Sequence, residues 1–263
     1  VHDYAVIPVP TKVAKTYFGG GRLESAYYIT KSGTKLYAVG PGLFTILDVT
    51  TPQTPTILGS VSSAHFGSSV SQVVVSGNFA YVNRAGTTGY DLVTVDISTP
   101  ASPVVVASST DYSTIANSSK LIVSGSHLYV SGGGNTTVSA WTLAAPAKPV
   151  YSGGINTAGS RGMAISGSYA YTCDSSGSQL NIVNISVPTA LTYATYANAA
   201  LSTCKHVAIS GSYLYTIGES SNQLSVFSIA TPSSPTFVGS ITNAALSGPV
   251  ELEASTDYVY VTR

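Results

Sequence analysis

The segment VVVSGNFAYV, at residues 73–82, returns as LIVSGSHLYV at residues 121–130. Further copies begin at Met163 and at Val207, and looser copies run from Tyr27 to Ala38 and from Leu252 to Val261. Five copies carry a serine in the turn, and the steps between these serines are 48, 42, 44 and 45 residues (Ser76, Ser124, Ser166, Ser210 and Ser255). A period of roughly 40–50 residues is typical of a β-propeller, in which each blade has four strands.

A second block follows each first block. It reads LVTVDISTPASP at residues 92–103, LFTILDVTTPQTP at 43–55 and LSVFSIATPSSP at 224–235. A short apolar run comes next, such as VVVAS at residues 104–108. Each repeat therefore offers four short β-rich runs separated by turn residues, and helical spacing of apolar residues is absent. The pattern predicts an all-β protein built from four-stranded antiparallel blades.

The two ends of the chain supply one further blade between them. The last repeat stops after two strands, at residues 258–263, while residues Tyr4–Val9 and Val13–Gly19 resemble the missing second half. Pairing the first strands with the last removes exposed sheet edges. We therefore expect a single domain over residues 1–263, a six-bladed β-propeller closed by N- and C-terminal strands. Its blades are expected at residues 24–63, 69–111, 115–157, 160–199, 203–245, and 249–263 with 1–20.

The block LVTVDISTPASPVVVASS followed by V-x-V-S-G-x-x-A-Y-V resembles the LVIVD repeat of bacterial and archaeal surface-associated propellers. The resemblance covers almost the whole chain, and it departs at the Asp position of the third and fourth blades, where Thr142 and Asn184 stand. It implies a propeller fold and a place at a surface. It implies no catalytic residues, because the family has no agreed catalytic set.

The composition argues against partners that would be attracted by a large net charge on the protein. Charged residues make up only 8% of the chain, and 11 basic residues balance 11 acidic ones, against roughly 25% charged in an average soluble domain. We therefore expect no nucleic-acid partner, and no run approaches the ~20 apolar residues of a membrane helix. The start at Val1 and the richness in Ser, Thr, Tyr and Gly suggest a processed or excised chain. The expected location is extracytoplasmic: secreted, or on a cell or particle surface.

Residues that recur in every blade are interpreted as structural. A tyrosine recurs on the second strand, where we expect it to pack between neighbouring blades with its hydroxyl hydrogen-bonded (Tyr37, Tyr81, Tyr129, Tyr171, Tyr215 and Tyr260). Asp48, Asp96, Asn184 and Ser228 precede the proline loop and are expected to accept hydrogen bonds from turn amides. The recurring Pro-x-x-Pro is expected to form a turn beside a protected edge strand.

Charged residues that do not recur are the candidates for function. Twelve of the 22 charged residues map to the loops that enter the first strand of a blade, or join its second and third strands, or lie just below them on an inner strand. In a propeller these loops surround one mouth of the central channel. The expected ligand-binding residues are Arg84, Lys120, Arg161, Asp174, Lys205, His206, Glu251 and Arg263. The alternative is that these charges only solvate the channel wall and pair in salt bridges that contribute little.

Cys173 and Cys204 map to the same face of adjacent blades. We expect a disulfide between them, which lowers the entropy of the unfolded chain. An alternative joins Cys204, His206 and Asp174 in a metal site, although Cys-x-His alone lacks the ligand count of a closed zinc site. We expect no metal and no cofactor.

Motifs of known enzymes are missing from the sequence. It has no Gly-x-Ser-x-Gly elbow, no His-Glu-x-x-His, and no Ser-x-Asp-x-Gly-x-Thr-Trp box. We therefore expect a non-catalytic, surface-displayed binding or structural module, serving adhesion, recognition or assembly, with a protein or glycan partner. One alternative is a carbohydrate-active enzyme or lectin with its site at the same mouth, and Glu251, Glu253, His206 and Arg161 are its conceivable acid–base groups. Another alternative is a virion or filament subunit, since low charge suits dense packing in a larger assembly.

Overall fold

The computed structural model describes residues 26–67, 70–84, 92–109, 118–132, 137–157, 159–174, 177–249 and 251–262. These residues form five four-stranded sheets and one two-stranded sheet, each an antiparallel meander in chain order. We name the sheets A to F. Strands of sheets A to C are β1 (Tyr28–Ser32), β2 (Lys35–Gly40), β3 (Leu43–Asp48), β4 (Thr56–Ser62), β5 (Val70–Ser76), β6 (Phe79–Arg84), β7 (Leu92–Asp96), β8 (Val104–Ser109), β9 (Ser118–Ser124), β10 (His127–Gly132), β11 (Thr137–Thr142) and β12 (Val150–Asn156). Strands of sheets D to F are β13 (Ser160–Ser166), β14 (Tyr169–Asp174), β15 (Gln179–Asn184), β16 (Thr192–Ala197), β17 (Cys204–Ser210), β18 (Tyr213–Gly218), β19 (Gln223–Ser228), β20 (Thr236–Thr242), β21 (Glu251–Ala254) and β22 (Val259–Thr262).

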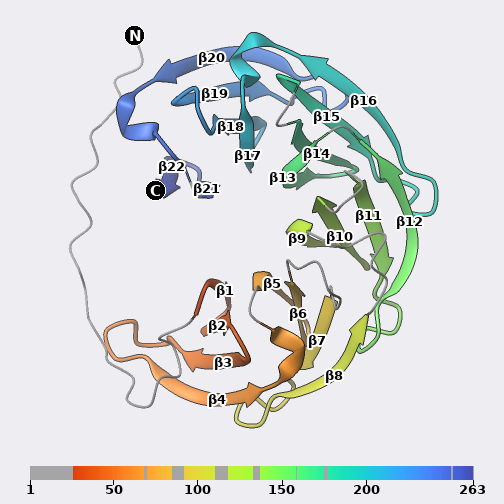
Figure 1. Cartoon of the computed structure of the whole chain (residues 1–263), viewed down its shortest axis with the longest axis vertical. Coiled ribbons are helices and arrows are strands. Elements are labelled where there is room, and N and C mark those ends of the chain that lie inside the picture. Colours follow the sequence, from red (N-terminus) through yellow and green to blue (C-terminus); the bar gives the residue numbers. More distant parts are fainter. Residues whose placement is uncertain are drawn as a thin grey trace.

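The sheets stand side by side around a central opening (Figure 1). The first strand of each sheet contacts the first strand of the next, in the order β1, β5, β9, β13, β17 and β21. The fourth strands β4, β8, β12, β16 and β20 lie at the periphery (Figure 1). Among the residues described, short 3₁₀ helices precede the first strands of sheets B, E and F: η1 (Ala64–Phe66), η2 (Ala199–Leu201) and η3 (Ala244–Leu246). In the part of the chain described, no helix is long and apolar enough to cross a membrane.

The hydrophobic core is divided between neighbouring sheets. One cluster of buried residues joins A to B, and others join B to C, C to D, D to E, and E to F. The alternation of apolar residues along each strand explains this arrangement, because successive side chains point to opposite faces of a sheet. Sheets B to E therefore each pack on a described neighbour with both faces, and sheets A and F with one.

The recurring tyrosines occupy one register position, as predicted. Tyr81 pairs with Val74 of the first strand and with Thr94 of the third, and the tyrosines of the other sheets pair at the corresponding places. Tyr81 and Tyr171 are fully buried. Their hydroxyls donate to the carbonyls of Pro146 (3.0 Å) and Pro232 (2.8 Å), each in the sheet that follows. The interpretation as inter-blade packing residues is confirmed for the buried tyrosines of sheets A to D, whereas Tyr215 is only partly buried and Tyr260 is 51% exposed.

The polar residue at the end of each third strand caps the following turn. The backbone N–H of Thr50 donates to Asp48 Oδ1 (2.7 Å), and that of Ser98 donates to Asp96 Oδ1 (2.8 Å). Asn184, Ser228 and Thr142 accept equivalent bonds. Hydrogen bonds to the carboxylates lower the pKa of Asp48 and of Asp96. The prediction of turn-making side chains is confirmed, and it holds at Thr142, where the acid is missing.

Each of these loops continues into a turn with proline at its second position. In sheet B the N–H of Ser102 donates to Thr99 O across Pro100, and Pro52, Pro146, Pro188 and Pro232 stand in corresponding turns. We call these the proline turns. The turn of one sheet presses on the outer strand of the sheet before it: a Cβ on Gly59 would lie 2.5 Å from Pro100 O, and one on Gly153 would lie 2.6 Å from Pro188 O. Glycine is needed there because the two backbones approach so closely.

Sheet F has two strands in the part of the chain described. The first 25 residues and Arg263, on which the expected closure of the last blade depends, lie outside the described residues.

Candidate functional site

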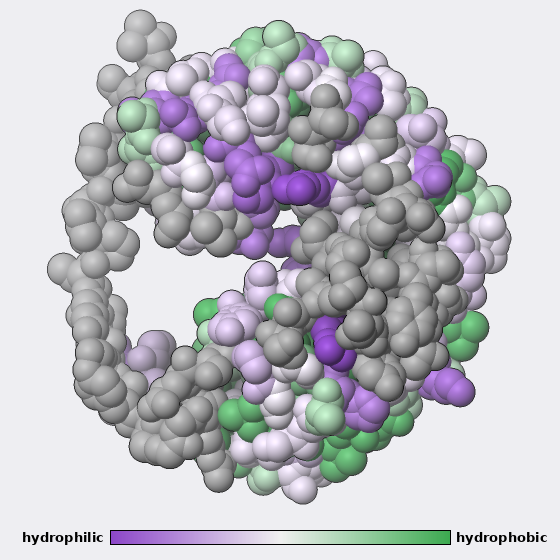
Figure 2. All heavy atoms as spheres, in the orientation of Figure 1, coloured by the Kyte–Doolittle hydropathy of each residue, from purple (hydrophilic) through white to green (hydrophobic). Residues whose placement is uncertain are grey.

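Hydrophilic residues gather around the central opening, as Figure 2 shows. At the mouth of the channel, the first strands of sheets B, D and E each contain a bulge. The bulges lie between Val70 and Gln72, between Arg161 and Ala164, and between Cys204 and His206. A bulge bends a strand and redirects its side chains. Gly162 has a left-handed backbone (φ 58°), and a Cβ on it would lie 2.9 Å from Lys205 O. The bulge and this glycine together bring the mouth ends of sheets D and E close to each other.

A three-residue ion cluster connects sheets D and E. Lys205 Nζ lies 2.7 Å from Glu219 Oε1, and Arg161 Nη1 lies 3.8 Å from Glu219 Oε2. The hydrogen bond from Lys205 and its positive charge lower the pKa of Glu219, and Arg161 adds to the effect. Two cations thus share one carboxylate. The Arg161 side chain is 54% exposed, so its guanidinium is accessible from the solvent.

A second ion pair joins sheets C and F across the channel. Lys120 Nζ lies 2.8 Å from Glu251 Oε1, and the Lys120 side chain is only 17% exposed. The charges of both ion groups act on His206. Burial lowers the pKa of His206, Glu251 raises it in part, and Lys205 and Lys120 lower it further. Among the described residues, Nε2 of its ring is buried without a hydrogen-bond partner. His206 is therefore held neutral near pH 7.

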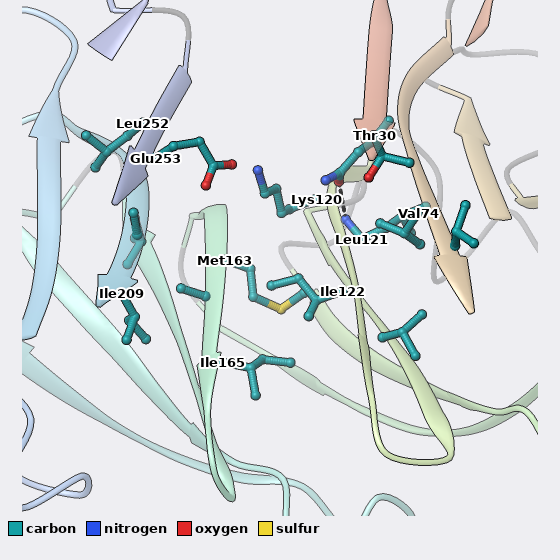
Figure 3. A pocket seen from close by; sticks show the side chains of 16 residues that line it. Thr30, Val74, Lys120, Leu121, Ile122, Met163, Ile165, Ile209, Leu252 and Glu253 are labelled. Carbon is teal, nitrogen blue, oxygen red and sulfur yellow. Dashed lines mark hydrogen bonds between the residues drawn. The ribbon is translucent and has the colours of Figure 1, made fainter. Parts of the chain in front are cut away.

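Below the mouth the channel contains a cavity of about 420 Å³. Figure 3 shows Lys120 and Glu253 pointing toward one another at its polar end, with Met163, Ile122 and Ile165 further along the wall. Gln72 lies at the same level and accepts a hydrogen bond from the backbone N–H of Leu121. The channel thus begins at a charged rim and continues between first strands that carry mainly apolar side chains.

A disulfide links sheets D and E beneath the ion cluster. The sulfurs of Cys173 and Cys204 are bonded, and their Cα atoms lie 5.4 Å apart. Both residues are buried. The bond removes Cys204 as a thiolate ligand, which contradicts the alternative of a metal site formed by Cys204, His206 and Asp174. The described part of the chain contains no group of three or more His, Cys, Asp or Glu residues placed to hold a metal.

The structure brings five of the predicted site residues into one neighbourhood: Lys120, Arg161, Lys205, His206 and Glu251. Asp174 lies at the same end of sheet D, opposite Ser160, but is buried. It is 2% exposed, lies against Gly177 and accepts a hydrogen bond from Gln179 Nε2 (2.8 Å), so it supports the loop of its own sheet. Arg84 ends β6, and its guanidinium lies over Gly67. Arg263 lies outside the described residues.

Sequence reasoning placed Glu219 on this face but did not select it for the site. It is the acid that both Arg161 and Lys205 contact. A signal was available, because the antiparallel hairpin pairs Cys204 with Gly218 and so sets Glu219 beside the start of β17. The role of Gln72 had no such signal, since its contact is to the backbone of another sheet.

The family model of the LVIVD repeat matches residues 67–111, 159–197 and 203–243. The chain carries LVIVD repeats in these three segments. The matched segments coincide with sheets B, D and E, and sheets A and C have the same strand order and tyrosine register. No curated protein is similar enough to count as a match.

Solved structures share the propeller fold of this chain. One is a protein of unknown function from Desulfotomaculum acetoxidans, with 13% identity and a TM-score of 0.67, over 80% of this chain and 67% of that one. A Lactobacillus plantarum protein has 17% identity and a TM-score of 0.69, over 82% and 71%. A putative 6-phosphogluconolactonase from Bacteroides fragilis has 15% identity and a TM-score of 0.72, over 89% and 76%. At such identity the likeness shows the β-propeller fold alone.

Proposed function

We propose that the chain is a non-catalytic binding module, displayed outside the cytoplasm, that holds an acidic group of a protein or glycan partner at the charged mouth of its channel. The observation that carries the proposal is the ion cluster shared by different sheets. Arg161, Lys205 and Lys120 supply three positive charges there, whereas Glu219 and Glu251 supply two negative ones. Glu253, which points toward Lys120 in Figure 3, supplies a third negative charge, so the surplus is local to Arg161 and Lys205, which share the single carboxylate of Glu219.

Arg161 is the group best suited to receive the partner. Its contact with Glu219 is 3.8 Å, longer than the 2.7 Å contact of Lys205 with the same carboxylate, and its side chain is the most exposed of the cluster. A guanidinium presents donors in a planar fork that fits a carboxylate or phosphate. An incoming carboxylate would therefore bind Arg161 without breaking the Lys205–Glu219 pair.

A six-bladed ring forms part of the proposal. Sheet F has only its two inner strands in the described residues, and its core with sheet E is small: Ala208, Ile217 and Leu252 are buried, with partly buried side chains around them. The segments Tyr4–Val9 and Val13–Gly19 have the β-rich pattern of the two strands that would complete it. Closing the ring in this way surrounds the mouth on all sides.

The test is a binding screen of the purified chain on an array of acidic and neutral glycans and peptides. We expect ligands that carry carboxylates to bind, and we expect the triple variant Arg161→Ala/Lys205→Ala/Glu251→Ala to lose at least tenfold in affinity. The matched control is Lys31→Ala/Lys35→Ala/Asp257→Ala, which removes the same charges near the turns between first and second strands, away from the mouth. Equal binding by both variants would show that the mouth charges only solvate the channel wall.

A further inference from the structure

The side of sheet E that faces sheet F carries an apolar groove of about 430 Å³. Its lining comes from the second, third and fourth strands: Tyr213, Tyr215, Leu224, Val226, Val238, Gly239, Ser240 and Ile241. Tyr213 is 47% and Val238 is 56% exposed. In Figure 1 the two strands of sheet F stand beside the inner part of sheet E, and β20 extends beyond them.

The other sheets show what normally covers these positions. The second-strand tyrosine is at most 5% exposed in sheets A to D, and so is the residue paired with it on the third strand (Tyr37, Tyr81, Tyr129 and Tyr171; Ile46, Thr94, Ala140 and Ile182). In sheet E the equivalent residues, Tyr215 and Val226, are only partly buried. Leu224 is also partly buried, although its four equivalents are 1% exposed or less (Phe44, Leu92, Val138 and Leu180). Within the described ranges, sheet E therefore lacks the cover that sheets B to E give to their predecessors.

The missing cover includes a proline turn. Gly239 pairs with Val226 just before a bulge, as Gly59 pairs with Ile46 and Gly153 with Ala140. Gly59 and Gly153 each receive the proline carbonyl of the next sheet, whereas a Cβ on Gly239 would meet nothing within 4 Å among the described residues. Tyr81 and Tyr171 donate to such a carbonyl, and Tyr215 stands at their position. In sheet C, which like sheet E has both the tyrosine and the glycine, Gly153 lies against Pro188 O while Tyr129 donates to Ile185 O of the same loop (3.5 Å). Sheet E thus has both positions at which the proline-turn loop of a following sheet is held.

We propose that this groove is the docking site of the chain's own residues 4–19, with the turn at Pro10 seated between the Tyr215 hydroxyl and Gly239. The sequence Val9-Pro10-Thr11 repeats Val187-Pro188-Thr189, the proline turn that packs on Gly153. The flanking runs YAVI and VAKTYF supply apolar side chains for an apolar groove. The proposal rests on the ring closure of the proposed function, and it names the surface and the contacts that hold the closing segment.

Hydrogen–deuterium exchange of the full chain, read by mass spectrometry, tests the docking. We expect peptides within residues 1–20 to be protected in the wild type. The variant Gly239→Val fills the place of the turn, so these peptides should exchange at least tenfold faster, and Tyr215→Phe should accelerate them by a smaller factor. Thr242→Val is the matched control, because it adds a β-branched apolar side chain to the exposed end of the same strand, outside the groove. Unchanged protection of β9–β12 shows that each variant is folded.

The outcomes separate the docking from the closure. Protection that survives Gly239→Val overturns the docking site and leaves a ring closed by other contacts. Residues 1–20 that exchange freely in the wild type overturn both proposals. Protection that appears only at high protein concentration, together with a dimer in native mass spectrometry, assigns the groove to the segment of a second copy and contradicts docking within one chain.

Discussion

The recurring tyrosines and His206 show how burial changes the chemistry of a side chain. Burial raises the pKa of Tyr81 and of Tyr171 to about 12, so both hydroxyls stay protonated and donate to the proline turn of the next sheet. Such a bond contributes about 1 kcal/mol. His206 is different, because its buried ring nitrogen has no partner in the described residues and its pKa is lowered.

Acidification should therefore destabilise the fold through His206. The unfolded chain takes up the proton as the pH falls through the ordinary value of 6.5, whereas the folded chain resists it. The unfolded state then binds more protons, and stability is lost as the pH falls from about 7 toward the lowered folded pKa. Glu251 and Glu219 moderate the effect, and Lys205 and Lys120 strengthen it. We expect the melting temperature to drop between pH 7.5 and 5.5 in the wild type.

The variant His206→Gln should flatten this dependence, since its side chain does not titrate. The measurement is thermal unfolding by circular dichroism at several pH values above 5, where the carboxylates with lowered pKa, such as Glu219, have not yet been protonated. Parallel curves for the two proteins would mean that the imidazole is equally basic in both states.

Neighbouring sheets are held together by contacts that recur along the chain and, at one place, by a covalent bond. The proline turns of sheets B and D pack on the outer strand of the sheet before them, which leaves room only for glycine at Gly59 and Gly153. The disulfide adds a link between β14 and β17, directly below the ion cluster of Arg161, Lys205 and Glu219. It fixes the relative position of the two sheets that carry most of the site.

Reduction of the Cys173–Cys204 bond should lower the free energy of unfolding by about 3–4 kcal/mol, because the bond closes a loop of intermediate length and restricts the unfolded chain. The sequence separation is 31 residues. Urea unfolding with and without reductant measures the difference. In the double variant Cys173→Ala/Cys204→Ala the reductant should have no effect. Identical transitions for oxidised and reduced wild type would contradict the prediction.

A ring of similar sheets can unfold as one unit or piece by piece, depending on whether it is closed. In linear repeat proteins each unit contacts only its neighbours, and cooperativity can fail along the array. The contacts between first strands run from β1 to β21, and the proposed closure would join the two ends. Closure should therefore make the whole domain cooperative.

We expect the fluorescence of Trp141 and the far-ultraviolet circular dichroism to report the same urea transition in the wild type. Trp141 is the single tryptophan of the chain and is buried in sheet C, far from the proposed junction. Removing residues 1–20 should lower the midpoint and separate the two transitions, because sheet E then unfolds before sheet C. A truncated chain with coincident, unshifted transitions would show that the first 20 residues contribute nothing to the domain.

The sequence alone determined the parts of the molecule that follow from local and periodic chemistry. The repeat predicted the four-stranded sheets, and the recurring tyrosines and Asp48-type turns were interpreted correctly, because each depends on neighbours within one blade or at a fixed offset in the next. Residues of the site were predicted as a group from their loop positions. The sequence could not predict which of these charged residues form ion pairs and which do not.

Only the tertiary structure decided which charges meet. Lys120 and Glu251 are 131 residues apart and pair across the channel, while Asp174 turns into its own loop and is buried. Bulges in the first strands and the left-handed Gly162 set these directions, and such departures from regular alternation leave no periodic signal. The open groove of sheet E was equally hidden, because its exposure becomes visible only when the same positions of four covered sheets lie beside it.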